Sequence, residues 1–188
     1  NPAFVASDLL SQAEHGIDSQ VILVSTSKNM IEAVEDEVVQ QLEELPRKEI
    51  ARQAIANSKL IYVEDDQTAI DLINEYGPEH YIVCVSNEDF YVKNTLNAGS
   101  VFIGNYTPES AGDYASGTNH TLPTNGYAKQ YSGVNLDSFM KNMTFQKISA
   151  EGIKNIGLKP SQRIQLFNGK LESWLMLAKV LRLDLMSL

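Results

Sequence analysis

Apolar positions in the first half of the chain follow two different patterns. Short continuous runs, rich in β-branched residues, are typical of strands buried on both faces; they occupy residues 21–24, 60–63, 81–85 and 101–103. Between them, apolar residues recur every three or four positions, which predicts amphipathic helices. These helices cover residues 2–15, 30–45, 47–58, 66–77 and 89–97, with Asp66 as an expected N-cap. Strands that alternate with helices predict an α/β fold: a mainly parallel sheet with flanking helices, resembling an incomplete Rossmann arrangement.

The pattern changes after the last of these strands. Residues 104–133 are rich in Gly, Ser, Thr, Asn, Tyr and Pro without any period, and so long a loop is typically either functional or disordered. Its interleaved tyrosines favour an ordered loop. Further on, the pattern predicts a short helix over 136–143, a strand over 144–148 and a helix from Ser149.

The last residues form a predicted apolar helix that needs a partner surface. Heptad-like spacing connects Leu171, Trp174, Ala178, Leu181, Leu185 and Leu188. We therefore expect two parts, an α/β domain over residues 1–134 and a small, mostly helical segment over 135–188 that mediates dimerisation.

Composition excludes several classes of protein. The chain has 188 residues and a net charge of −9, from 24 acidic and 15 basic side chains, so binding to nucleic acid is not expected. No apolar run is long enough to span a bilayer, so no membrane is expected either. A single cysteine excludes a disulfide framework and a Cys-rich zinc site. The chain opens on Asn1-Pro2 without a secretory leader or an initiator Met, which favours a cytoplasmic protein and a fragment of a longer one.

The first candidate site lies at the end of the first predicted helix. Gln12 and His15 are three residues apart and share a helix face. Their amide oxygen and imidazole nitrogen are ligands that zinc and similar metals accept. The alternative is structural, because a histidine at a helix C-terminus also stabilises the helix dipole.

Two further candidate sites contain the other histidines. Glu79 and His80 are an adjacent acid–base pair between a helix and a strand, although a solvated turn has the same composition. In the long loop, Asp113 is a candidate metal ligand and His120 a candidate substrate contact; here the alternative is Asx-turn chemistry. Because ligands collect at the carboxyl ends of parallel strands, we expect the three sites to meet there.

Taken together, the three motifs resemble histidinol dehydrogenase, in particular its C-terminal portion. They are Asp-Leu-Leu-Ser-Gln-Ala-Glu-His-Gly at 8–16, Gly-Pro-Glu-His at 77–80 and Ser-Ala-Gly-Asp-Tyr-Ala-Ser-Gly-Thr-Asn-His-Thr-Leu-Pro-Thr at 110–124. Their order and spacing match that family from Asn1 to about Gly157.

The resemblance implies a homodimeric zinc enzyme of histidine biosynthesis. Such an enzyme oxidises L-histidinol through L-histidinaldehyde to L-histidine and transfers two hydrides to NAD⁺. By resemblance, Gln12, His15 and Asp113 are zinc ligands and, with His120, substrate contacts. His80 abstracts the alcohol proton, and Glu79 activates the water that attacks the aldehyde. The nicotinamide-binding portion of the family is absent here, so no residue of this chain is assigned to NAD.

The tail departs from the family pattern. Gly169 and Trp174 stand where the family has a Glu and a His that reach the partner subunit's site, and that His is the fourth zinc ligand. A shifted reading frame is one explanation. We therefore expect the isolated chain to be inactive. Two alternatives are a non-catalytic zinc-binding or dimerisation module and an α/β core whose histidines are structural.

Overall fold

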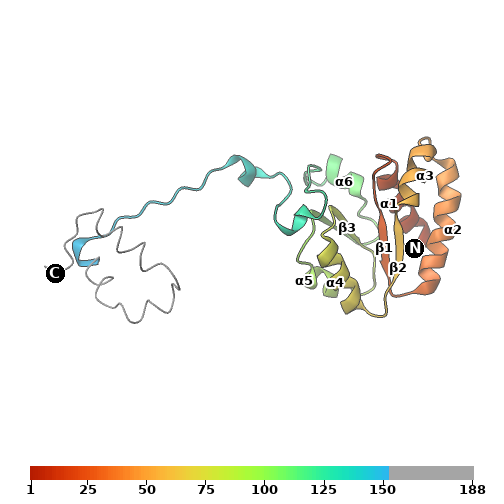
Figure 1. Cartoon of the computed structure of the whole chain (residues 1–188), viewed down its shortest axis with the longest axis horizontal. Coiled ribbons are helices and arrows are strands. Elements are labelled where there is room, and N and C mark those ends of the chain that lie inside the picture. Colours follow the sequence, from red (N-terminus) through yellow and green to blue (C-terminus); the bar gives the residue numbers. More distant parts are fainter. Residues whose placement is uncertain (153–188) are drawn as a thin grey trace. The chain divides into compact units, whose positions relative to one another are not determined.

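A computed structural model describes residues 1–152 of the chain (Figure 1). The chain divides into two compact units, residues 1–140 and 141–188, and the predicted boundary after residue 134 stays a prediction. In the first unit the elements are α1 (Pro2–Ala13), β1 (Ile22–Ser25), α2 (Lys28–Glu44), α3 (Lys48–Ala56), β2 (Lys59–Tyr62), α4 (Asp66–Tyr76), β3 (His80–Val83), α5 (Glu88–Asn94), β4 (Ser100–Ile103) and α6 (Glu109–Tyr114). In the second unit, residues 150–152 are helical. The predicted heptad and the departures at Gly169 and Trp174 lie outside the described residues.

The four strands form two parallel pairs. β1 pairs with β2, with Ile22 opposite Lys59, and β3 pairs with β4, with His80 opposite Ser100. Helices α2 and α3 connect the first pair and α5 connects the second, as parallel pairing requires. The predicted α/β class with parallel strands is confirmed, although the described strands form two sheets of two instead of one sheet.

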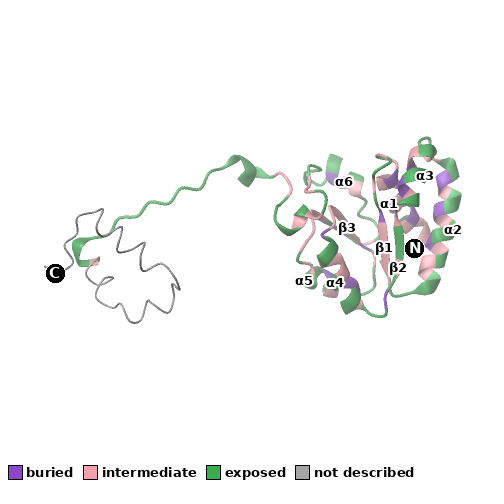
Figure 2. Cartoon of the chain, viewed as in Figure 1, coloured by how far each residue is buried: buried purple, intermediate pink, exposed green. Residues whose placement is uncertain are grey.

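One core is built from the first three helices, which Figure 1 shows beside the β1–β2 pair. Its buried side chains, purple in Figure 2, are Ala6, Leu10, Ala13, Val34, Val38, Leu42, Ala51 and Ala54. Leu23 of β1 packs against this cluster. Because the alanines have short side chains, α1 can pack closely on α2 and α3, and this packing fixes the helix that carries Gln12.

A second core joins α4 and α5 to β3. It consists of Val63, Ala69, Ile70, Tyr81, Val83 and Tyr91. Val24 of β1 and Ile61 of β2 also pack against it, so α4 contacts both strand pairs. The Tyr91 hydroxyl donates to Asp66 at 2.8 Å; burial, followed by this bond, raises the pKa of Tyr91.

Helix α4 is capped at both ends, and its C-terminal cap precedes the Glu79–His80 pair. Asp65, not Asp66, is the N-cap: its carboxylate accepts from the Thr68 N–H at 2.7 Å. The prediction was one residue late because both positions hold an Asp. At the other end Gly77 adopts φ +65°, a left-handed conformation that favours glycine.

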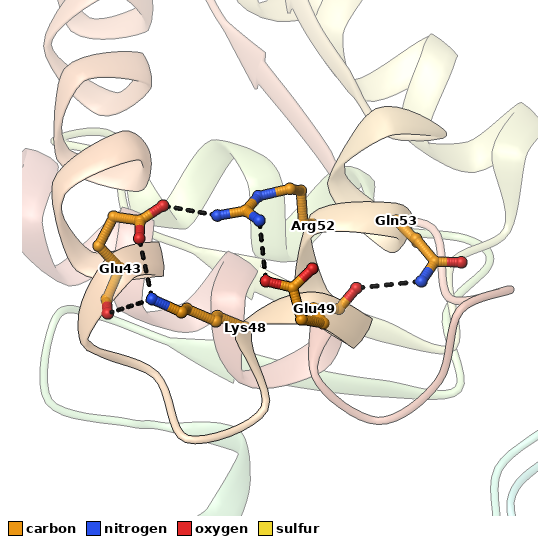
Figure 3. Close-up of polar contacts among 5 residues, drawn as sticks. All are labelled: Glu43, Lys48, Glu49, Arg52 and Gln53. Carbon is orange, nitrogen blue, oxygen red and sulfur yellow. Dashed lines mark hydrogen bonds and ion pairs between the residues drawn. The ribbon is translucent and has the colours of Figure 1, made fainter.

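A surface network holds α3 against the end of α2 (Figure 3). Glu43 accepts from Lys48 Nζ at 3.0 Å and from Arg52 at 2.6 Å, and Arg52 also reaches Glu49 at 2.9 Å. These bonds to Lys48 and Arg52 lower the pKa of Glu43. All four side chains are exposed to solvent, so the network orients α3 more than it stabilises the fold.

The structure corrects three expectations after β4. The long segment 104–133 contains the helix α6, and a short 3₁₀ helix at Tyr127–Lys129. The predicted helix over 136–143 is a single 3₁₀ turn at Leu136–Phe139. Residues 144–148 form no strand, because no neighbouring strand of the described chain pairs with them. Within residues 1–152, no helix is long and apolar enough to cross a membrane.

The packing of α2 predicts a position-dependent effect of one substitution. Val34 has no exposed surface, whereas Val39 in the same helix is 62% exposed. Val34→Ala should lower the free energy of unfolding by about 2 kcal/mol, from lost burial and the cavity left behind. Val39→Ala should change it by less than about 0.5 kcal/mol. Urea unfolding followed by circular dichroism checks both, and equal losses would contradict this packing.

Candidate active site

The Glu109 carboxylate joins residues from three elements of the fold. With its amide oriented to donate, Gln12 of α1 places its nitrogen 3.1 and 3.2 Å from the two Glu109 oxygens. His80 Nε2 of β3 lies 3.3 Å from Glu109 Oε1. Glu109 itself is the first residue of α6. The first and second sequence motifs are therefore brought together by a residue that belongs to neither.

His80 is held in place by its ring as well as by this contact. It is the first residue of β3, and its imidazole stacks on Phe102 of β4 with ring centroids 6.0 Å apart. Burial lowers the pKa of His80, and His15 lowers it further, against Glu79 and Asp113, which raise it. Its place at the amino end of β3 contradicts the expectation that the site lies at the carboxyl ends of the strands. The reason is that Glu79 directly precedes β3 and His80 is its first residue.

His15 is exposed and bonded to its own helix. Its Nδ1 lies 2.9 Å from the carbonyl oxygen of Ser11 in the last turn of α1. This bond fulfils the helix-capping alternative. It is also compatible with metal binding, because a proton on Nδ1 leaves the lone pair on Nε2, and metal-binding histidines commonly make such a bond.

Acidic side chains surround the Glu109 carboxylate. Asp113 follows Glu109 by four residues and so shares its face of α6. Burial raises the pKa of Glu109, and Asp113 raises it further, while His15 lowers it. Burial and the nearby Glu109 likewise raise the pKa of Asp8 on α1. Concentrated negative charge of this kind favours a cation in the site.

Close packing at Gly112 sets the position of α6. A Cβ at this buried residue would lie 2.7 Å from Thr118 Oγ1 and 3.1 Å from Phe102 Cε1. Only glycine lets the helix approach the ring on which His80 stacks. The same contact therefore positions Glu109 and Asp113 relative to His80.

A cavity of about 1370 Å³ opens beside these residues. Gln12, His15, Glu79, His80, Asp8 and Glu109 line it. Within residues 1–152, no group of three or more His, Cys, Asp or Glu side chains is arranged to hold a metal ion. A metal site built on His15 would therefore need the Gln12 amide as a ligand.

Five of the six predicted residues meet in one region of the fold. Gln12, His15, Glu79 and His80 line one cavity. Asp113 is close enough to raise the pKa of His80 and of Glu109, which also line it. His120 is exposed, and the adjacent Asn119 side chain accepts from the Thr121 N–H at 2.8 Å, as in the Asx-turn alternative. Its contact with substrate stays a prediction.

Sequence reasoning missed Asp8 and Glu109. Asp8, Gln12 and His15 follow each other by four and three residues, a polar stripe on one helix face that the pattern could have indicated. Glu109 gave no comparable signal, because it lies in a segment without periodicity.

Comparisons with known proteins agree on one family. The histidinol dehydrogenase family model matches residues 1–163. The chain is 60% identical over 157 residues to the Bacteroides thetaiotaomicron histidinol dehydrogenase. This match covers 84% of this chain and 37% of the relative. It is 56% identical over 156 residues to the histidine biosynthesis trifunctional protein of Saccharomyces cerevisiae, covering 82% of this chain and 20% of that protein.

A solved structure shows the same relationship. The crystal structure of histidinol dehydrogenase from Elizabethkingia anophelis matches with a TM-score of 0.79 and 54% identity, over 88% of this chain and 38% of that one. The chain thus spans less than half the length of the histidinol dehydrogenases that it matches. On the strength of the matched residues and of the shared fold, it belongs to the histidinol dehydrogenase family.

Proposed function

We propose that this chain supplies the metal-binding and acid–base part of an enzyme that oxidises L-histidinol through L-histidinaldehyde to L-histidine. The observation that carries the proposal is the Glu109 carboxylate in contact with both Gln12 and His80. Relatives named histidinol dehydrogenase cover most of the chain. Two NAD⁺ molecules accept the hydrides, and their binding residues belong to the portion of the enzyme outside this chain.

The donor set fits zinc. His15 would bind through Nε2, because Nδ1 is engaged with the Ser11 carbonyl. Gln12 would bind through its amide oxygen, because its nitrogen donates to Glu109, and Asp113 would add a carboxylate. Zinc supplies a Lewis-acidic charge beside the substrate when it is bound. In the sequence, Trp174 stands where the family has the His that serves as the fourth zinc ligand, so we expect no fourth ligand from that position.

His80 suits proton abstraction from the alcohol. Burial lowers the pKa of His80, which favours the neutral imidazole, and a neutral imidazole can accept a proton. If Nε2 donates to Glu109, the lone pair remains on Nδ1 for the proton of the alcohol as its hydride leaves for NAD⁺. The imidazolium that results is then stabilised by the Glu109 carboxylate at 3.3 Å.

Glu79 suits the second half-reaction. Glu79 lines the same cavity as His80, and its carboxylate would accept a proton from the water that attacks the aldehyde. Oxidation of the resulting hydrate completes the reaction at one site, which avoids release of a reactive aldehyde. We further propose that His120 contacts the substrate, that the tail mediates a homodimer, and that the enzyme acts in the cytoplasm.

A chimera tests this function directly. The matched 157 residues of this chain replace their counterparts in the Bacteroides thetaiotaomicron enzyme, and NADH formation from L-histidinol is followed with zinc present. The chimera should turn over, while its His80→Gln and Glu79→Gln variants should lose about 10²–10⁴-fold in kcat, as expected for general acid–base groups.

The matched control is Glu75→Gln, an exposed carboxylate on α4 that pairs with Lys129, which should leave kcat unchanged. The isolated 188-residue chain should show no turnover. An active chimera that keeps its kcat in His80→Gln would refute the assigned base. A folded, zinc-binding chimera without any turnover would favour the non-catalytic module.

The lowered pKa of His80 predicts a specific pH dependence of stability. Its pKa in the folded chain is below its ordinary value, so the unfolded chain takes up the proton first as the pH falls. Stability from this group is therefore present at neutral pH and is lost below about pH 6.5. Between about pH 7.5 and about pH 5.5, the parent chain should lose more unfolding free energy than His80→Gln. His120→Gln, at an exposed position, serves as the control and should follow the parent, whereas an unchanged slope in His80→Gln would contradict the buried, neutral imidazole.

A further inference from the structure

Two residues at the start of β4 hold the backbone of Glu79. The Gly99 N–H donates to the Pro78 carbonyl at 2.9 Å. The Ser100 N–H donates to the Glu79 carbonyl, also at 2.9 Å. These bonds extend the β3–β4 pairing, in which His80 lies opposite Ser100. They therefore fix the backbone of a residue that lines the cavity beside His80.

Only a glycine fits where Gly99 faces this backbone. A Cβ on Gly99 would lie 2.6 Å from the Glu79 carbonyl oxygen and 3.3 Å from the Leu122 Cβ. The shorter distance is a clash with main-chain atoms, which no side-chain rotation can relieve. Gly99 does not adopt a positive φ, so the position requires glycine for its small size and not for its conformational freedom.

The segment that carries Gly99 is anchored and cannot move back to make room. Asn74 on α4 accepts through Oδ1 from the Leu96 N–H at 2.7 Å and from the Asn97 N–H at 3.3 Å. The Asn97 side chain in turn donates to the Asn74 carbonyl at 2.8 Å. The next residue, Ala98, packs against the core that α4 and α5 share. A Cβ on Gly99 would therefore displace the opposite backbone rather than its own segment.

His80 has contacts of its own that do not depend on this approach. Its imidazole stacks on Phe102 and contacts the Glu109 carboxylate. These contacts hold the ring in place when the preceding peptide shifts. A displacement at Gly99 therefore acts on Glu79 more than on His80, so the two members of the acid–base pair are positioned separately.

We propose that Gly99 is a positioning residue for Glu79, and through it for the second oxidation, from L-histidinaldehyde to L-histidine. The inference rests on the function proposed above for Glu79. In this step the water oxygen bonds to the aldehyde carbon while a proton of that water passes to the Glu79 carboxylate, a geometry that tolerates little displacement. Proton abstraction from the alcohol by His80 makes no such demand on Glu79. A side chain on Gly99 therefore slows the second oxidation selectively.

Gly99→Ala in the chimera described above tests this selectivity. NADH formation from L-histidinaldehyde reports on the second oxidation alone, and the first NADH formed after rapid mixing with L-histidinol reports on the first. Gly99→Ala should slow the second oxidation at least about tenfold and the first less than about threefold. Leu96→Ala, at a 79% exposed side chain of the same segment, is the control and should change neither. Equal losses in the two oxidations, or an unchanged second oxidation, would overturn the proposal.

Amide hydrogen exchange tests the displacement without any catalysis. The Ser100 N–H bonds to the Glu79 carbonyl, so in the 188-residue chain it should exchange at least about tenfold faster in Gly99→Ala than in the parent or in Leu96→Ala. Equal exchange in the three proteins would contradict the displacement.

A second variant keeps the glycine and removes the anchor of its segment. Asn74→Ala deletes the side chain that holds Leu96 and Asn97, so it should also slow the second oxidation more than the first, by at least about threefold. It decides the question if Gly99→Ala does not fold, and equal losses in its two oxidations would refute the positioning role.

Glu79→Gln separates a failure of this inference from a failure of the proposed function. If Glu79→Gln oxidises L-histidinaldehyde as fast as the parent chimera, the role of Glu79 is wrong and the inference falls with it. If Glu79→Gln loses this oxidation and Gly99→Ala keeps it, only the role of Gly99 is wrong. An inactive chimera would count against the proposed function, while the exchange of Ser100 still tests the displacement.

Discussion

The geometry of the site depends on one buried carboxylate shared by two partners. Glu109 accepts from the Gln12 amide and contacts the His80 imidazole, so a helix, a strand and a second helix meet at its two oxygens. Because burial raises its pKa, its charge is costly unless both partners stay in place. The proposed cation would be held by the Gln12 oxygen, which this arrangement leaves free, together with the His15 Nε2 and the Asp113 carboxylate.

The fold supports this carboxylate from two sides. Helix α1 is fixed by the alanine-rich core that it shares with α2 and α3, and α6 rests on Phe102 through the buried Gly112.

Periodicity predicted the regular elements well because local sequence determines them. The valine and isoleucine runs marked all four strands, and the four-residue spacing of Val34, Val38 and Leu42 marked α2. The pairing of the strands was not predictable, since it joins segments that lie far apart in the sequence. Residues 144–148 show the opposite failure: they were predicted to form a strand, but no strand of the described chain pairs with them.

The candidate site was predictable only as far as its motifs were contiguous. Gln12, His15, Glu79, His80 and Asp113 lie in short recognisable stretches, whereas Glu109 entered the site through the packing of α6 on Phe102, a contact that no spacing in the sequence encodes. The sequence also did not show that the site lies at the amino end of β3, because this depends on the strand beginning at His80 itself.

The central claim is that Gln12, His15 and Asp113 hold one cation next to His80. Because the chain has three histidines, imidazole ¹⁵N NMR during a zinc titration reports on each of them. The account predicts a shift of the His15 Nε2 resonance that saturates at one equivalent of zinc. The zinc affinity read from this shift should be unchanged in Asp89→Ala and at least about tenfold lower in Asp113→Ala. A His15 resonance that does not respond to zinc, or equal affinity in the two variants, would contradict it.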